Sequence, residues 1–166
     1  MNNFTWESQK KVGDAGEQKV RDLMRARGHE VENLADDPQY WDKDIDMRVS
    51  GQTVEVKTDN VMHRTGNLFI EYETLCASGE VHKGWFEITE AQYLFYLDNV
   101  NEILHIYDMG ELKKYVSQKR RYLEKKCLSF ASGKEVWGYL LPYGRIAHAT
   151  INLKEASAWQ KLSLAA

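Results

Sequence analysis

Two short runs decide the fold: Asp44-Ile-Asp-Met-Arg-Val49 and Gln52-Thr-Val-Glu-Val-Lys-Thr58, joined by Ser50-Gly51. Both runs are rich in residues that favour strands, and a Gly-containing turn between such runs is typical of a β-hairpin. Side chains alternate along a strand, so Glu55 and Lys57 share one face of the second run. The turn also brings Asp46 to the position opposite Glu55 on the neighbouring strand. The hairpin therefore predicts that three charged side chains lie together.

A Glu and a Lys on one face of a strand can be explained in three ways. Packed in a core, each charge would cost several kcal/mol in desolvation. In bulk water, an exposed salt bridge on a hairpin contributes at most about 1 kcal/mol. In a polar cleft the carboxylate can hold a cation, and Asp46 favours this explanation, because two adjacent carboxylates repel unless a proton or cation lies between them. The exposed salt-bridged hairpin remains the alternative.

Asp46 and Glu55 offer only oxygen ligands, which suit Mg²⁺ or Mn²⁺. Such an ion polarises a phosphoryl oxygen and lowers the pKa of an attacking water. A neighbouring Lys57 would orient that water or offset charge on phosphorus. Asp44, one pleat earlier on the same face, is a rival to Asp46 for the metal. The site therefore predicts hydrolysis of a phosphodiester.

The pattern Asp46 followed by Glu55-Val56-Lys57 resembles the PD-(D/E)XK nuclease superfamily. The segments Gly13-Asp-Ala-Gly-Glu-Gln-Lys-Val20 and Ala26-Arg-Gly-His-Glu-Val31 resemble the opening helix and first strand of its Holliday-junction-resolvase-like branch. The resemblance covers roughly residues 13–75. The Pro that gives the motif its first letter is missing directly before Asp46. The resemblance implies a restriction-endonuclease-like fold with an αβββαβ core, a role for Glu17 in completing the metal site, and divalent-metal nuclease activity on DNA.

The remaining composition is that of an ordinary globular chain. The 166 residues and 19.3 kDa predict one domain, and 43% hydrophobic with 28% charged residues argue against disorder. No run of about 18 apolar residues predicts a membrane span, and the first residues do not have the pattern of a secretion signal. Two cysteines without a CxxC spacing argue against a zinc ribbon or disulfide scaffold and favour the cytoplasm.

The rest of the chain predicts a mixed sheet with flanking helices, an α/β fold. Residues 6–27 have the apolar spacing of an amphipathic helix, and residues 110–126 form a basic helix. Residues 68–73 are expected to be the third strand of the sheet. Further strands are expected at 29–34, 93–97, 103–107, 136–141 and 149–153, followed by a short C-terminal helix. Most of the aromatic residues at 93–107 are expected in the core. Glu71, on the strand after the hairpin, is a candidate to support the site.

Charge is unevenly distributed, although the formal net charge is only −3. Residues 111–126 carry seven basic and two acidic residues, whereas five aspartates and a single lysine lie between residues 36 and 46. A basic segment can follow DNA phosphates without reading sequence. The alternative is a solvated helix face. The residues expected to contact DNA are Lys113, Lys114, Lys119, Arg120 and Arg121.

Together these features predict a metal-dependent DNA endonuclease. A domain of this size has no obvious module for reading a long sequence, so selectivity for DNA structure (a junction, a flap or an end) is expected. Cutting two opposing strands needs two sites, which suggests a homodimer by analogy with the resolvase-like branch. Repair, recombination, phage replication and defence are all compatible pathways. The alternative is a catalytically inactive nuclease-fold module that binds DNA or a protein partner.

Overall fold

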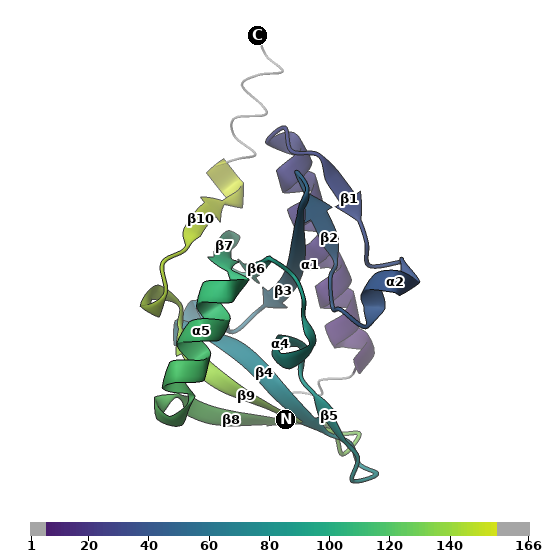
Figure 1. Ribbon diagram of the computed structural model, residues 1–166, viewed down its shortest axis with the longest axis vertical. Helices are drawn as coiled ribbons and strands as arrows, with labels where there is room; N and C mark the ends of the chain where they lie inside the picture. The colour runs from purple at the N-terminus through teal and green to yellow at the C-terminus, as the bar shows by residue number, and fades with distance from the viewer. Residues whose placement is uncertain (1–5, 156–166) are drawn as a thin grey trace.

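The computed structural model describes residues 6–155, which fold into two β-sheets with helices around them (Figure 1). The helices are α1 (Trp6–Ala26), α2 (Pro38–Trp41), α3 (Met62–Thr65), α4 (Trp85–Ile88), α5 (Met109–Lys119) and the 3₁₀ turns η1 (Arg120–Tyr122) and η2 (Tyr143–Arg145). The strands are β1 (Val31–Asn33), β2 (Met47–Val49), β3 (Gln52–Asp59), β4 (Asn67–Leu75), β5 (Val81–Lys83), β6 (Tyr93–Asp98), β7 (Ile103–Asp108), β8 (Glu124–Ser129), β9 (Glu135–Pro142) and β10 (Ala149–Asn152).

The central sheet has six strands in the order β1-β2-β3-β6-β7-β10. Only β3 and β6 are parallel, and the other neighbours in this sheet are antiparallel. Since parallel neighbours need a crossover connection, the chain leaves the sheet after β3 and returns through α4. The order α1-β1-β2-β3-α4-β6 is an αβββαβ core, so the predicted mixed α/β fold, with a central mixed sheet flanked by helices, is confirmed.

The crossover is more elaborate than the sequence predicts. It contains β4 and β5, which join β8 and β9 in a second, four-stranded antiparallel sheet of order β5-β4-β9-β8. The prediction that residues 68–73 form the third strand of the main sheet is therefore wrong. Strand propensity identifies a strand but not its partner, and β4 pairs with β9, about 70 residues later in the chain.

The basic helix is also shorter than predicted. The helix α5 ends at Lys119, η1 follows, and residues 124–129 form β8 at the edge of the second sheet. The segment after Tyr122 has extended backbone because it pairs with β9, which overrides the helix propensity of its lysines. The predicted C-terminal helix falls largely beyond residue 155 and so lies outside the described residues.

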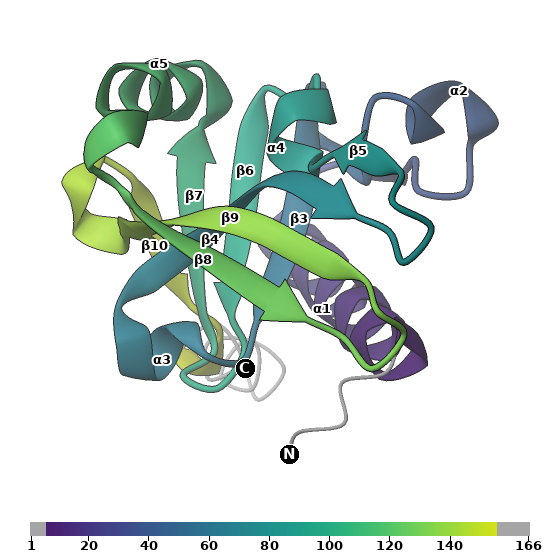
Figure 2. The same cartoon turned by 90° about the horizontal axis from the view of Figure 1, so that it is seen from below.

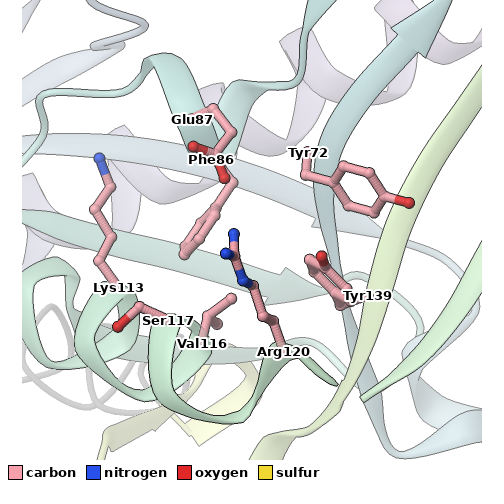
Figure 3. A pocket seen from close by; sticks show the side chains of 8 residues that line it. All are labelled: Tyr72, Phe86, Glu87, Lys113, Val116, Ser117, Arg120 and Tyr139. Carbon is pink, nitrogen blue, oxygen red and sulfur yellow. The ribbon is translucent and has the colours of Figure 1, made fainter. Parts of the chain in front are cut away.

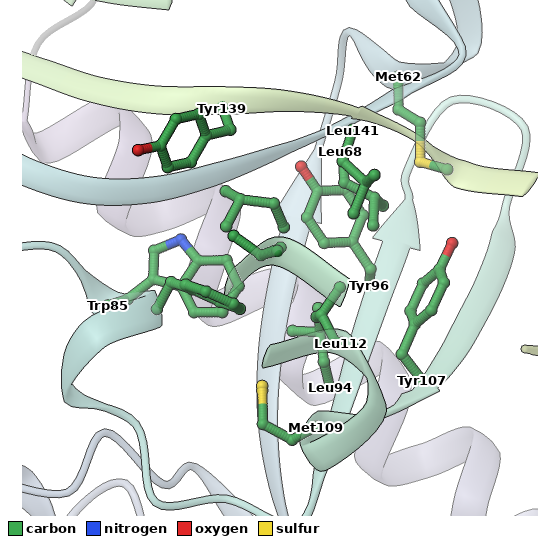
Figure 4. Packing of buried hydrophobic residues seen from close by; sticks show 13 residues of the cluster. Met62, Leu68, Trp85, Leu94, Tyr96, Tyr107, Met109, Leu112, Tyr139 and Leu141 are labelled. Carbon is green, nitrogen blue, oxygen red and sulfur yellow. The ribbon is translucent and has the colours of Figure 1, made fainter. Parts of the chain in front are cut away.

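Three layers result (Figure 2). The helix α1 covers one face of the central sheet, where Val20, Leu23 and Met24 pack on buried residues of β2, β3 and β6. The second sheet, α4 and α5 cover the other face, and Figure 4 shows the aromatic and aliphatic side chains between them. Phe95, Tyr96 and Tyr107 are buried, as predicted for core aromatics.

One buried hydroxyl connects the two sheets. Tyr96 on β6 donates a hydrogen bond from its hydroxyl to Asp59 Oδ2 at 2.7 Å and accepts one from the backbone N–H of Phe69 at 3.0 Å. Asp59 ends β3 and Phe69 lies on β4, so this hydroxyl joins three strands.

Within the described residues, no helix is both long and apolar enough to cross a membrane.

Candidate active site

The hairpin brings Asp46 opposite Glu55. The β2–β3 register pairs Met47 with Val54, and the N–H of Asp46 extends this pairing with a 3.0 Å bond to Val54 O. Asp46 Oδ2 in turn accepts a 2.7 Å hydrogen bond from the N–H of Val56. Asp46 is therefore hydrogen-bonded to β3, the neighbouring strand that carries Glu55 and Lys57, as the hairpin predicts.

Glu55 and Lys57 form an ion pair on the face of β3 opposite α1. Glu55 is fully buried, while 29% of the Lys57 side chain is exposed, so the pair extends from the interior to the protein surface. The Lys57 ammonium also lies 3.8 Å from Asp44 Oδ2 and 5.2 Å from the ring of Trp85. The ring supports the ammonium from the α4 side by a cation–π contact.

Burial dominates the electrostatics of this cluster. It raises the pKa of Glu55 well above its ordinary value, and the negative charges of Asp46 and Asp44 raise it further. Burial likewise raises the pKa of Asp46. For Lys57 burial acts in the opposite direction, but the carboxylates of Glu55, Asp44 and Asp46 outweigh it, so its pKa is raised. Lys57 is therefore held as a cation among carboxylates.

Asp44 adopts a backbone conformation that few residues with a side chain adopt. Its φ is +48°, in the left-handed region where Asp is tolerated better than most residues. Its carbonyl accepts a 3.0 Å bond from the Thr89 hydroxyl, which holds the segment before β2 against the end of α4. This conformation directs Asp44 toward Lys57, so both Asp44 and Asp46 lie at the site. The two aspartates remain rival candidates for the metal.

Glu17 approaches from α1, the helix that covers the opposite face of the sheet. It forms an ion pair with Arg21 at 3.4 Å, and 19% of its side chain is exposed. Burial raises the pKa of Glu17 to about 7, and the negative charge of Asp46 contributes to this rise. Glu17 therefore lies in the electrostatic field of Asp46, at the edge of the sheet where β2 begins.

A glycine allows α1 to come this close. A Cβ on Gly16 would lie 1.8 Å from Thr58 Oγ1 and 2.9 Å from Thr58 Cβ, so only a residue without a side chain fits between α1 and β3. Gly16 precedes Glu17, and Thr58 follows Lys57. This one contact therefore sets the distance between the helix that carries Glu17 and the strand that carries the Glu-x-Lys pair.

Glu71 enters the same region from β4. Burial raises its pKa, whereas the positive charge of Lys57 and a hydrogen bond from Thr74 lower it. Gly84 lets the start of α4 contact this strand, because a Cβ there would lie 2.5 Å from Glu71 O. The next residue after that glycine is Trp85, whose ring supports Lys57. No sequence pattern assigns Trp85 or Thr89 to the site, and only their contacts identify them.

The donor set fits a hard cation. Three buried carboxylate oxygens, both of Glu55 and Oδ2 of Asp44, have no hydrogen-bond partner among residues 6–155, although Lys57 forms ion pairs with Glu55 Oε1 and Asp44 Oδ2. Several carboxylates surround one lysine, and a cation would offset their mutual repulsion. Within that range no group of three or more His, Cys, Asp or Glu side chains is arranged so that it could hold a metal ion. The residues thus offer oxygen ligands of a suitable kind but do not form a three-ligand site.

The predicted DNA-contacting residues do not form one uniform face. Lys114, Lys119, Arg120 and Arg121 are exposed on α5 and η1, and Lys114 lies 3.8 Å from Glu111. Lys113 instead turns inward, and its ammonium donates a 2.6 Å hydrogen bond to Thr89 O. Contact with DNA stays a prediction for this set.

Comparisons with known proteins complete the description of the site. No protein-family model matches the sequence, and no curated protein matches it significantly. Among solved structures, the chain is similar to the bacterial homing endonuclease I-Ssp6803I, with 14% sequence identity, a TM-score of 0.49 and coverage of 93% of each chain. A likeness at this identity and TM-score bears on neither the reaction, the metal nor the substrate, and these rest on the residues above.

Proposed function

We propose that this protein is a divalent-metal-dependent DNA endonuclease of the PD-(D/E)XK superfamily, resembling its Holliday-junction-resolvase-like branch. The observation that carries the proposal is the convergence of Asp46, Glu55 and Lys57 at the β2–β3 hairpin of an αβββαβ core. This convergence suits hydrolysis of a phosphodiester, because it places carboxylates for a hard cation beside a fixed ammonium.

Each residue has a distinct role in the proposed reaction. Asp46 and Glu55 would hold Mg²⁺ or Mn²⁺, with Glu17 supporting from α1 and Asp44 as the rival to Asp46. The bound ion supplies Lewis acidity toward a phosphoryl oxygen and toward water. Lys57, held by Glu55 and Asp44, donates hydrogen bonds that orient the attacking water or offset the charge that develops on the phosphate. Trp85 restricts where the ammonium can lie.

We further propose that the substrate is recognised by its structure, as a junction, a flap or an end, and that the enzyme works as a homodimer in the cytoplasm. Exposed cations on α5 and η1 supply charge that is insensitive to sequence. Both cysteines are free, in keeping with a reducing compartment. Sedimentation with and without a four-way junction measures the oligomeric state.

The direct test is cleavage of a four-way junction, a flap and a plain duplex by the purified protein in Mg²⁺, Mn²⁺ or EDTA. We expect cleavage that needs the metal and that Lys57→Ala, Glu55→Gln and Asp46→Asn each reduce by at least about 100-fold. Lys43→Ala is the matched control, because Lys43 is an exposed lysine directly before the Asp44–Asp46 segment. Its rate should remain that of the wild type.

Two results would overturn the proposal. One is absence of metal-dependent cleavage by the wild type on every substrate, and the other is equal cleavage by the wild type and Lys57→Ala. Binding of DNA without cleavage would instead favour the inactive nuclease-fold module. Parallel urea unfolding of each variant distinguishes loss of the reaction from loss of the fold.

A further inference from the structure

A hollow lies beside α4, the helix that also carries Trp85. It has a volume of about 400 Å³, within the size range of small-ligand sites. Its walls come from β4, β9, α4, α5 and η1, and Figure 3 shows their side chains around it. The lining residues are Tyr72, Phe86, Glu87, Lys113, Val116, Ser117, Arg120 and Tyr139. Three of these eight residues are aromatic, and two are cations from α5 and η1.

Tyr72 reaches this hollow because β4 is irregular there. The β4–β9 register shifts between Glu71 and Glu73, which pair with Gly138 and Trp137, so Tyr72 is the extra residue of a β-bulge. Bulges redirect side chains and are common beside active sites. The Tyr72 ring is stacked on Tyr139 with 4.6 Å between centroids, so Tyr139 supports one face of the Tyr72 ring.

The polar groups of the hollow are unequal. The Lys113 ammonium is already held by Thr89 O at 2.6 Å and lies 6.0 Å from the centre of the Phe86 ring. The Arg120 guanidinium instead extends into the hollow between Phe86 and the two tyrosines (Figure 3). Glu87 adds one exposed carboxylate at the α4 wall. A bound molecule would therefore contact an aromatic ring and, beside it, the Arg120 guanidinium.

The hollow is one aromatic residue away from the candidate active site. Trp85, which supports Lys57, contacts Phe86 edge-on with 5.6 Å between ring centroids, and Phe86 lines the hollow. The bulge makes the same connection on β4, since Glu71 lies in the field of Lys57 and the next residue lines the hollow. A DNA strand bound at Lys57 can therefore also reach the hollow.

We propose that this hollow binds one unpaired nucleotide of the DNA substrate, with its base on Tyr72 and its phosphate on Arg120. The inference rests on the proposed function, because it assumes that DNA is the substrate. Stacking accepts every base, and the guanidinium pairs with a phosphate in two-point fashion. Unpaired nucleotides occur at flaps, frayed ends and open junctions but not in a fully paired duplex, so the hollow would supply selectivity for DNA structure.

The test is equilibrium binding in EDTA, where no cleavage occurs. The probes are a fluorescently labelled short oligodeoxyadenylate and an abasic strand of the same length. Tyr72→Leu should weaken binding of the oligodeoxyadenylate by about 5- to 100-fold and leave the abasic strand unchanged, whereas Tyr72→Phe should bind both as the wild type does. Arg120→Gln should weaken both strands and reduce the salt dependence by about one released ion.

Tyr122→Leu is the matched control, because Tyr122 is 69% exposed on η1 and does not line the hollow. It should bind both strands with wild-type affinity. Equal affinity of the wild type for the two strands, no binding of either strand, or an equal loss on both strands in Tyr72→Leu would overturn the inference. Cleavage by Lys57→Ala is measured separately, so either proposal can fail while the other stands.

Discussion

The carboxylate of Asp46 accepts a 2.7 Å hydrogen bond from the backbone N–H of Val56. This contact links the residue just before β2 to the centre of the Glu55-Val56-Lys57 run, so Asp46 has a structural role as well as a proposed metal-binding role. The two roles can be separated by substitution, because an amide oxygen accepts the same hydrogen bond but is a weaker ligand for a hard cation.

The free energy of unfolding of Asp46→Asn should therefore lie within about 1 kcal/mol of the wild-type value. That of Asp46→Ala should be lower by about 1–3 kcal/mol, because the Val56 N–H is left unsatisfied. Mg²⁺ at 100 times its Kd should stabilise the wild type by about 2.7 kcal/mol, or several degrees in Tm, and should stabilise neither variant comparably. Urea and thermal unfolding with and without Mg²⁺ measure both effects. An equal Mg²⁺ shift in all three proteins would exclude Asp46 as a ligand.

Removing Lys57 should destabilise the fold, because it leaves the fully buried Glu55 without its ion-pair partner. We expect Lys57→Met to lose about 2–4 kcal/mol at pH 8, somewhat less than a fully buried pair because 29% of the Lys57 side chain is exposed. The double variant Lys57→Met/Glu55→Gln should recover most of this loss. Urea unfolding of the four proteins in a double-mutant cycle tests the coupling, and additive losses would contradict it.

Two glycines of α1 should respond in opposite ways to the same substitution. Gly16→Ala should lose about 1–3 kcal/mol, because the new Cβ overlaps Thr58 and α1 must move away from β3. Gly13→Ala is the control on the same helix: nothing lies within 4 Å of its Cβ, and it should gain roughly 0.5–1 kcal/mol from helix propensity. Similar losses in both variants would argue against the close contact.

The stability should depend on pH through His105, which is 5% exposed and lies 3.1 Å from His148, Nδ1 to Nε2. Burial and then the neighbouring His148 lower the pKa of His105 to about 4, whereas Asp98 raises it. His105 takes up its proton near pH 6.5 in the unfolded chain but only near pH 4 in the folded chain. The contribution of the neutral His105 to the free energy of unfolding is therefore fully present above pH 6.5 and is lost as the pH falls toward 4.

Glu17, with its raised pKa, acts in the opposite direction, so the quantity to compare is the difference between the wild type and His105→Gln. Between pH 7 and pH 5 the advantage of the wild type should shrink by roughly 1–2 kcal/mol. A pH-independent difference for His105→Gln would contradict the prediction.

The local part of this structure could be predicted from the sequence. Alternation of side chains and a Gly turn suffice to place Asp46 opposite Glu55, and the register shows that pairing. The helix α1 was likewise recognisable from the spacing of Val20, Leu23 and Met24. These features depend on neighbours a few residues apart, which is the range over which periodicity carries information.

The non-local part could not be predicted in this way. Trp85 supports Lys57 only because the crossover folds back and Gly84 lets it contact β4. The lysines at 125 and 126 favour a helix by propensity, yet pairing with β9 makes them part of a strand. Such contacts depend on which distant segment supplies the partner, and a single sequence contains no local signal for that choice.

The hydroxyl of Tyr96 has a mechanical consequence. Moving the two sheets apart would break the bond that it accepts from the Phe69 N–H, whereas its bond to Asp59 lies within the central sheet and would remain. This hydroxyl therefore opposes separation of β4 from the central sheet and holds the second sheet at a set distance from β6.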